Sequence, residues 1–80
     1  MPRITYNTLL TQRRAWLVQV TGDDTSVTLG VVRSISPDVW LAVNRSGVPA
    51  TVSTRKAAAC YLAYSQGEPD AAEAELARAA

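Results

Sequence analysis

The sequence predicts an α+β domain in which an antiparallel sheet of three to four strands carries one C-terminal helix on one face, followed by a short alanine-rich helical tail. Three observations lead to this prediction. Short runs rich in β-branched and apolar residues are separated by turn residues, as in antiparallel sheets. After Ser53, good helix formers replace that pattern. The 80 residues, 48% hydrophobic and 19% charged, have the composition of a single ordered domain.

Residues 14–66 are expected to form the domain itself, between an N-terminal arm at 1–13 and an acidic, alanine-rich tail at 67–80. Within the arm, Asn7 can cap a short helical turn, and this is the interpretation that we favour. The alternative is that Ile4 and Tyr6 belong to an edge strand that begins the sheet.

The first strand of the domain is predicted at 14–20, where apolar residues alternate with other types. A strand places successive side chains on opposite faces, so that Trp16, Val18 and Val20 share one face and Leu17 lies on the other. The larger apolar side chains of the first set are expected to face the core.

The second strand is predicted at 26–35, after a turn at 21–25 whose Gly and Asp residues tolerate the dihedral angles of a chain reversal. Gly30 interrupts this run of β-branched residues. A glycine within a strand indicates a bulge or the close approach of another element. The turn residues at 36–38 end the strand.

A hairpin is predicted next, because two apolar runs at 39–43 and 48–52 flank the short polar loop 44–47, which contains a glycine. Pro49 lies within the second run. Proline has no N–H to donate to a strand ladder, so this strand is expected at an edge of the sheet or to be interrupted there.

The helix is predicted to begin after Thr54, whose hydroxyl suits the N-cap. One side of this helix should lie on the sheet, and its residues are Ala58, Tyr61, Leu62 and Ser65. The opposite side is small or apolar where a solvated face would carry charge, and it contains Lys56, Ala59, Cys60 and Ala63. Either the tail or a second molecule is therefore expected to cover the back of the helix.

The tail differs from the rest of the chain in charge. Residues 1–65 contain seven basic and three acidic residues, a net charge of +4, whereas 66–80 contain one basic and four acidic residues, a net charge of −3. Pro69 can start a second helix, in which Leu76 is the only large apolar anchor. Such a short helix is marginal in water, so we expect it to fray unless it docks on the domain.

The residue types that carry most catalytic chemistry are missing, and we expect neither an enzyme nor a cofactor or metal site. The chain has no histidine, which excludes Ser-His-Asp and Cys-His sites within it. Cys60 lies in mid-helix, far from the N-terminal turn that would help to lower its pKa, and is interpreted as an inert small residue. Asp23 and Asp24 are interpreted as solvated turn charges rather than metal ligands.

No apolar run is long enough for a transmembrane helix, and the first residues lack the hydrophobic region of a secretory signal. With a single cysteine, the chain cannot form an internal disulfide. We therefore expect a cytoplasmic protein without a membrane partner.

Three features between Gly30 and Tyr64 form a pattern: an aromatic and a small residue alternate on a strand, a glycine turn follows, and threonine with basic residues opens the helix. The residues are Trp40-x-Ala42, Gly47 and Val52-x-Thr54-Arg55-Lys56-x-Ala58. In this pattern the region resembles small sheet-plus-helix DNA-binding domains, namely the arm-binding domains of phage-type tyrosine recombinases and the ethylene-response-factor domains of plants. The resemblance implies that the free sheet face enters the major groove of DNA.

Under this resemblance, the protein is expected to be a small non-enzymatic DNA-binding or accessory protein, with a phage or mobile-element origin. Trp40 and Ala42 would lie beneath the helix, and the opposite face would meet the duplex. The basic residues available for DNA phosphates are Arg14, Arg33, Arg45, Arg55 and Lys56.

The second hypothesis is a protein-interaction or self-association module, because the predicted free face is more apolar than a groove-reading sheet requires. The candidate partner-binding residues are Leu17, Leu41 and Val43. The back of the helix is an alternative contact surface. A third hypothesis is a structural role in an extracellular setting or a virion.

Overall fold

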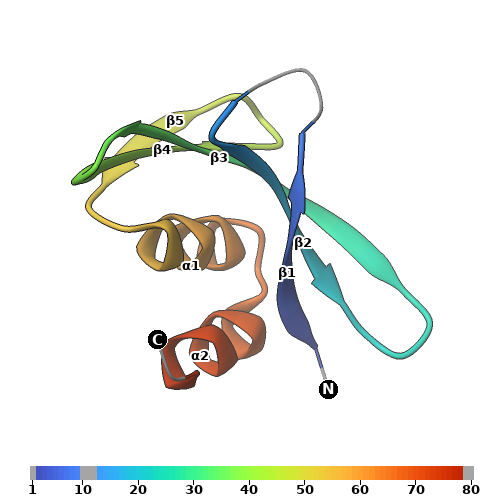
Figure 1. The fold of residues 1–80 in the computed structure, drawn as a ribbon. Coiled ribbons are helices and arrows are strands. Elements are labelled where there is room, and N and C mark those ends of the chain that lie inside the picture. Colours follow the sequence, from blue (N-terminus) through green and yellow to red (C-terminus); the bar gives the residue numbers. More distant parts are fainter. Residues whose placement is uncertain (1, 10–12, 79–80) are drawn as a thin grey trace.

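The computed structural model describes residues 2–9 and 13–78 and shows an α+β fold, which confirms the predicted class (Figure 1). The elements, in chain order, are β1 (Arg3–Thr8), β2 (Ala15–Thr21), β3 (Ser26–Ser36), β4 (Val39–Asn44), β5 (Pro49–Val52), α1 (Arg55–Ser65) and α2 (Pro69–Ala77). The strands form one five-stranded sheet in the order β1-β2-β3-β4-β5, with every neighbouring pair antiparallel.

Strand β1 corrects the interpretation that we favoured for the N-terminal arm. No helical turn forms at Asn7; instead β1 pairs with β2 from Arg3 opposite Thr21 to Thr8 opposite Trp16. The alternative, an edge strand, is right: pairing satisfies the backbone groups of β1 that face β2, and Ile4 is buried to 1% exposure. Residues 10–12 of the predicted arm lie outside the described residues.

The contact between β2 and β3 contains the irregularity that Gly30 predicts. The register of the two strands shifts between Val18 and Gln19, opposite this glycine. Gly30 has a φ of +153°, and a Cβ added to it would lie 2.2 Å from the Val43 carbonyl oxygen of β4. A side chain is therefore excluded at this position, and both the predicted bulge and the predicted close approach are present.

The β4–β5 hairpin and its edge position are also confirmed. The Asn44 side-chain oxygen accepts hydrogen bonds from the backbone N–H groups of Ser46 and Val48, at 2.9 and 3.1 Å. The Gly47 N–H donates to the Asn44 carbonyl at 2.9 Å and completes the turn. Strand β5, which begins at Pro49, lies at one edge of the sheet, where proline's missing N–H is tolerated.

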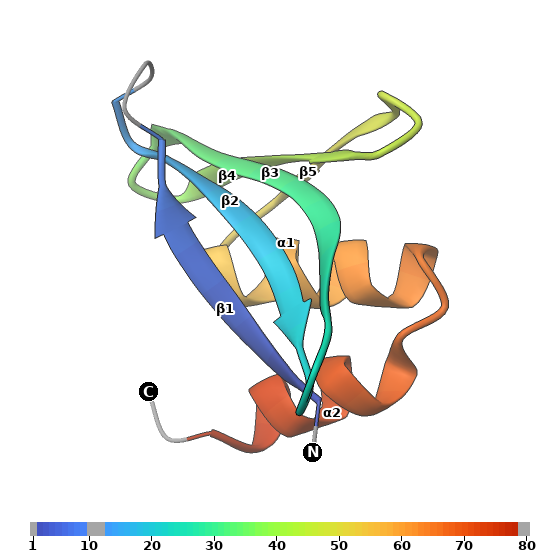
Figure 2. The same ribbon diagram turned by 90° about the vertical axis from the view of Figure 1, so that its right-hand side faces the viewer.

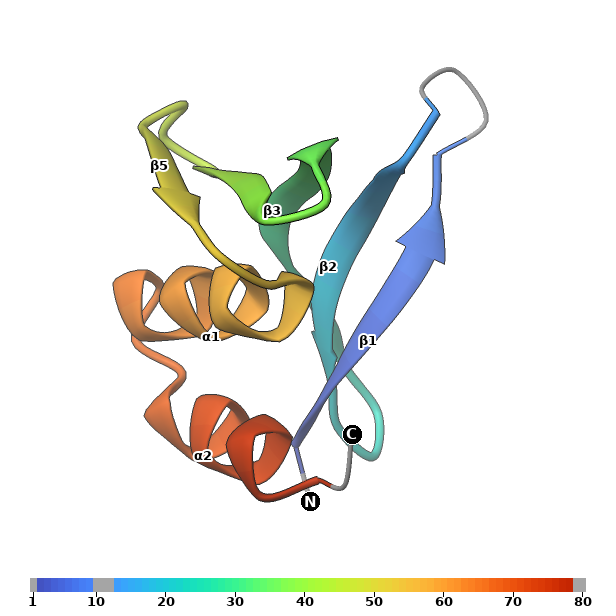
Figure 3. The same cartoon turned by 60° about the vertical axis from the view of Figure 1, so that its left-hand side comes forward.

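Helix α1 begins at the predicted cap and packs against one face of the sheet, as Figure 3 shows. The Thr54 hydroxyl oxygen accepts a hydrogen bond from the Ala57 N–H at 3.0 Å. Leu62 is fully buried beneath the sheet, and Trp40 packs against the same core cluster. Trp40 also contacts Trp16, with 5.4 Å between the ring centroids.

Helix α2 docks on α1 and β1, so that α1 lies between α2 and most of the sheet (Figure 2). Of the two predicted covers for the back of α1, the tail is therefore the right one. The Cys60 thiol donates to the Ala72 carbonyl at 3.6 Å, and Ala71 and Ala72 are fully buried. The predicted anchor is wrong, because Leu76 is 55% exposed and small alanines make the contact instead.

Candidate functional site

The face of the sheet that points away from both helices carries the candidate site. In a strand, successive side chains face opposite sides of the sheet. The side chains that face the helices and the core include Val18, Val32 and Ala42, all fully buried. On the outer face, the register places Val31 of β3 between Leu17 of β2 and Val43 of β4. These side chains form a short apolar row across the centre of the sheet.

An open groove of about 400 Å³ lies over this row, and we call it the outer groove. Its lining residues are Leu17, Thr28, Gly30, Val31, Arg33, Leu41, Val43, Asn44 and Arg45. All three predicted partner-binding residues line this groove, together with Val31, which the sequence analysis did not select.

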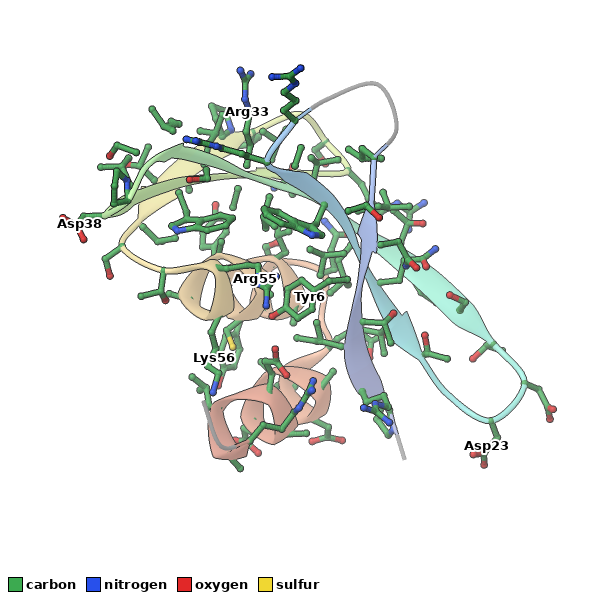
Figure 4. The ribbon with its side chains drawn as sticks, in the orientation of Figure 1. Tyr6, Asp23, Arg33, Asp38, Arg55 and Lys56 are labelled. Atoms are coloured by element: carbon green, nitrogen blue, oxygen red, sulfur yellow. The ribbon has the colours of Figure 1, made fainter. Side chains whose placement is uncertain are left out.

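The outer groove also brings together Arg33 and Arg45, two of the five predicted DNA-binding residues. Both side chains are exposed, and among the described residues neither forms an ion pair. In Figure 4 Arg33 points away from the helices, whereas the labelled acidic residues lie at the chain reversals. No carboxylate lines the groove, so its rim is positively charged.

Arg14 lies close to this region through the backbone. Its carbonyl accepts a hydrogen bond from the Ser34 N–H at 2.9 Å, which places it beside the residue that follows Arg33. The side chain of Arg14 is exposed. Arg14 is therefore an exposed cation just before the start of β2, near Arg33 along the backbone, although it does not line the groove.

The other two predicted DNA-binding residues lie on the helix side of the sheet. The Arg55 guanidinium stacks 4.5 Å from the centroid of the Tyr6 ring and 5.3 Å from that of Trp16, which are cation–π contacts. Lys56 donates to the Arg78 carbonyl at 2.8 Å. The sheet separates these cations from Arg33 (Figure 4). This division was not predicted, because the favoured interpretation placed Tyr6 in an arm rather than in the sheet.

A buried carboxylate joins the two ends of the chain on this same side. Glu75 of α2 is only 4% exposed, and its oxygens accept hydrogen bonds from the Tyr6 hydroxyl and, at 2.8 Å, from the Arg78 guanidinium. The spacing of Glu75 and Arg78 on a helix is a visible sequence signal. The contact with Tyr6 has no such signal, because it spans nearly the whole chain.

Replacing Tyr6 by Phe should make stability less dependent on alkaline pH. Burial, reinforced by the Glu75 carboxylate, raises the pKa of the Tyr6 hydroxyl well above its ordinary value. The folded state then favours the protonated phenol. Its stabilising contribution is complete below about pH 10, the pKa of an unfolded tyrosine, and is lost as the pH rises above it. We expect Tyr6→Phe to cost about 1–2 kcal/mol at neutral pH.

The measurement is the free energy of unfolding in urea between about pH 8 and 11. The control is Tyr64→Phe, since the Tyr64 side chain is half-exposed and should retain the decline of the parent protein. The Cys60 thiol is present in the parent protein, in Tyr6→Phe and in Tyr64→Phe, so its own titration contributes to the alkaline decline of all three. An equally steep decline in Tyr6→Phe would show that Tyr6 does not carry the alkaline sensitivity.

The position of Cys60 suits a packing role rather than a reactive one. It is buried between α1 and α2, and desolvation, with a further contribution from Glu75, raises the pKa of its thiol. A raised pKa keeps the thiol protonated, and a protonated thiol is a poor nucleophile. Within 2–9 and 13–78, no group of three His, Cys, Asp or Glu side chains is arranged to hold a metal ion.

Comparison with protein-family models found no match, and searches of curated proteins and of solved structures found none either. Neither helix in the described part of the chain is long and apolar enough to cross a membrane. The outer groove and its arginines are therefore the features from which a function is inferred.

Proposed function

We propose that this protein is a non-enzymatic binding module that binds an anionic macromolecule in the outer groove. The observation that carries the proposal is that exposed Arg33 and Arg45 line the same groove, and that no carboxylate lines it. Acidic side chains gather elsewhere, including Asp70 and Glu73 on α2, which lies beyond α1. Such a separation of charge attracts an anionic partner to one face.

Duplex DNA is the first candidate partner. Arg14, Arg33 and Arg45 are exposed at or beside the outer face, where each can contact a phosphate. A sheet face can enter the major groove, and Thr28 and Asn44 offer polar groups to base edges. The region 30–64 resembles small sheet-plus-helix DNA-binding domains, and this resemblance supports DNA as the partner. It also supports a role as an accessory protein of a phage or mobile element.

An acidic protein is the second candidate, and the apolar floor of the groove favours it. Protein interfaces combine an apolar centre with a polar rim in which arginine is enriched. The half-buried Leu17, Leu41 and Val43 form such a centre, with Arg33 and Arg45 at the rim.

Salt dependence tests the DNA candidate. If Arg14, Arg33 and Arg45 each neutralise one phosphate, the logarithm of the DNA affinity should fall against the logarithm of salt concentration with a slope of about −2.7. This slope corresponds to about 40-fold weaker binding at 200 mM than at 50 mM salt. The measurement is fluorescence anisotropy with a labelled duplex of about 20 base pairs, which at about 68 Å is longer than the protein.

A single substitution makes this test specific to the outer face. Arg33→Ala should reduce the slope to about −1.8, since one fewer counterion is released. Arg3→Ala removes the same charge from an exposed position that does not line the groove, and should leave the slope unchanged. Equal slopes for the two variants would contradict DNA binding on this face.

A further inference from the structure

We infer that the outer groove binds a short acidic segment of another protein, with an apolar side chain of that segment on the groove floor and its carboxylates on Arg33 and Arg45. This inference rests on the proposed function and specifies its partner. It follows from the charge of the rim, the chemistry of the floor and the size of the groove.

The rim offers two exposed guanidinium groups to negative charge from outside the described chain. Arg33 and Arg45 line the same groove, are exposed, and have no ion-pair partner among the described residues. Arg78, by comparison, is paired with Glu75 at 2.8 Å. Arginine presents a planar set of donors that matches a carboxylate with two parallel hydrogen bonds. A segment with two carboxylates would satisfy both arginines at once.

The floor favours protein over DNA. Leu17, Val31 and Val43 lie side by side across three strands and are only half-buried, so an apolar side chain placed on them removes further apolar surface from water. Base edges present mainly hydrogen-bonding groups, which these side chains cannot satisfy. The cations at Arg55 and Lys56 also lie on the helix side, which leaves few contacts for phosphates on this face.

The size of the groove favours a short segment. Its volume of about 400 Å³ lies near the lower end of the range for sites that hold small ligands, about 300–1,000 Å³. A few side chains fill such a space, whereas a globular surface would need a broader flat contact. Pro49 lies in the edge strand β5, where it blocks part of the backbone pairing that an added strand would require.

A second copy of this chain is a poor occupant. A two-fold contact through the same face would place the outer groove of one molecule against that of the other. Each groove brings Arg33 and Arg45 and no carboxylate, so the interface would bury like charges without compensation. Charge therefore disfavours a two-fold dimer through this face, and the inference assigns the acidic segment to a different protein.

The test uses labelled peptides of about eight residues, a length that spans about 26 Å when extended. The first, the Glu-Leu peptide, repeats Glu-Glu-Leu-Leu, so that each face of the extended chain carries both residue types. The second, the Glu-Ser peptide, has Ser in place of Leu, which retains the charge and removes the apolar side chains. The third has Lys in place of Glu, which reverses the charge. Binding is measured by fluorescence anisotropy, and the amide signals of Val31 and Val43 in NMR spectra report where the peptide lies.

We expect the Glu-Leu peptide to bind at least about tenfold more tightly than either of the other two, since it alone satisfies both the rim and the floor. Its binding should shift the signals of Val31 and Val43. Arg33→Ala and Leu41→Ser should each weaken it about tenfold. The matched substitutions Arg3→Ala and Leu76→Ser remove the same groups from exposed positions outside the groove and should change the affinity less than about twofold.

Equal binding of the Glu-Leu and Glu-Ser peptides would overturn the inference, as would shifts confined to residues outside the groove. Tight binding of duplex DNA through Arg33, with no peptide binding, would overturn the inference and leave the proposed function intact. If neither the peptides nor DNA bind the parent protein, both fail. A dimer in sedimentation that Leu41→Ser dissociates would replace the segment by a second copy and also overturn the inference.

Discussion

Replacing Gly30 by Ala should destabilise the protein by about 3 kcal/mol or more, from backbone strain of about 1–3 kcal/mol and a steric term of similar size. The backbone at Gly30 has a φ of +153°, which L-residues rarely adopt. The added Cβ would also lie 2.2 Å from the Val43 carbonyl oxygen, so that β3 and β4 would have to separate in the middle of the sheet. The measurement is urea unfolding of both proteins, compared through their midpoints at equal slope.

Gly47→Ala is the matched control, because it separates backbone strain from steric clash. Gly47 has a φ of +82°, but a Cβ added there would meet no atom within 4 Å. Only the strain of a left-handed residue should remain, about 1 kcal/mol. If the two substitutions destabilise the protein equally, then the close approach of β3 and β4 is not what requires glycine at position 30.

Replacing Leu62 by Ala should cost about 2–5 kcal/mol, because it leaves a cavity where α1 meets the sheet. Leu62 is one of the largest fully buried side chains and belongs to the same core cluster as Val32 and Ala42. A domain of this size is stabilised by only about 5–15 kcal/mol in total, so a large part of its stability would be lost. Urea unfolding at neutral pH again provides the measurement.

The control for this substitution is Leu76→Ala, which removes the same atoms from α2. Leu76 is 55% exposed, and substitutions at such positions usually change stability by less than about 0.5 kcal/mol. A large loss at Leu76 together with a small loss at Leu62 would mean that α2, rather than α1, supplies the main apolar contact of the core.

The central part of the fold could be predicted from the sequence because its signals are local. The β4–β5 loop contains Asn44 and Gly47, and α1 begins with the cap at Thr54; neighbours in the sequence satisfy both features. The resemblance to small DNA-binding domains also implied that Leu41 and Val43 lie on the face opposite the helix, and both line the outer groove. The three predicted partner-binding residues therefore share one groove, although their binding role stays a prediction.

The ends of the chain could not be predicted in this way. Asn7 favours a helical cap locally, yet its segment forms β1, because pairing satisfies the backbone groups that face β2 along the six-residue strand and Ile4 is buried in the core. In α2, hydrophobicity indicated Leu76 as the anchor, whereas close contact with α1 selected small alanines and buried Glu75. The division of the basic residues also depends on β1, because Arg55 stacks on Tyr6.

Strands β2 to β5, the turns between them and the capped helix could be predicted, since each depends on residues a few positions apart. Only the folded chain shows that β1 adds a fifth strand at the edge, that α2 covers α1, and that Arg33 and Arg45 border one groove while Arg55 and Lys56 lie on the other side of the sheet. The physical reason is the separation of the partners. Tyr6 and Glu75 meet across 69 positions, and a contact of that kind leaves no periodicity or spacing in the sequence.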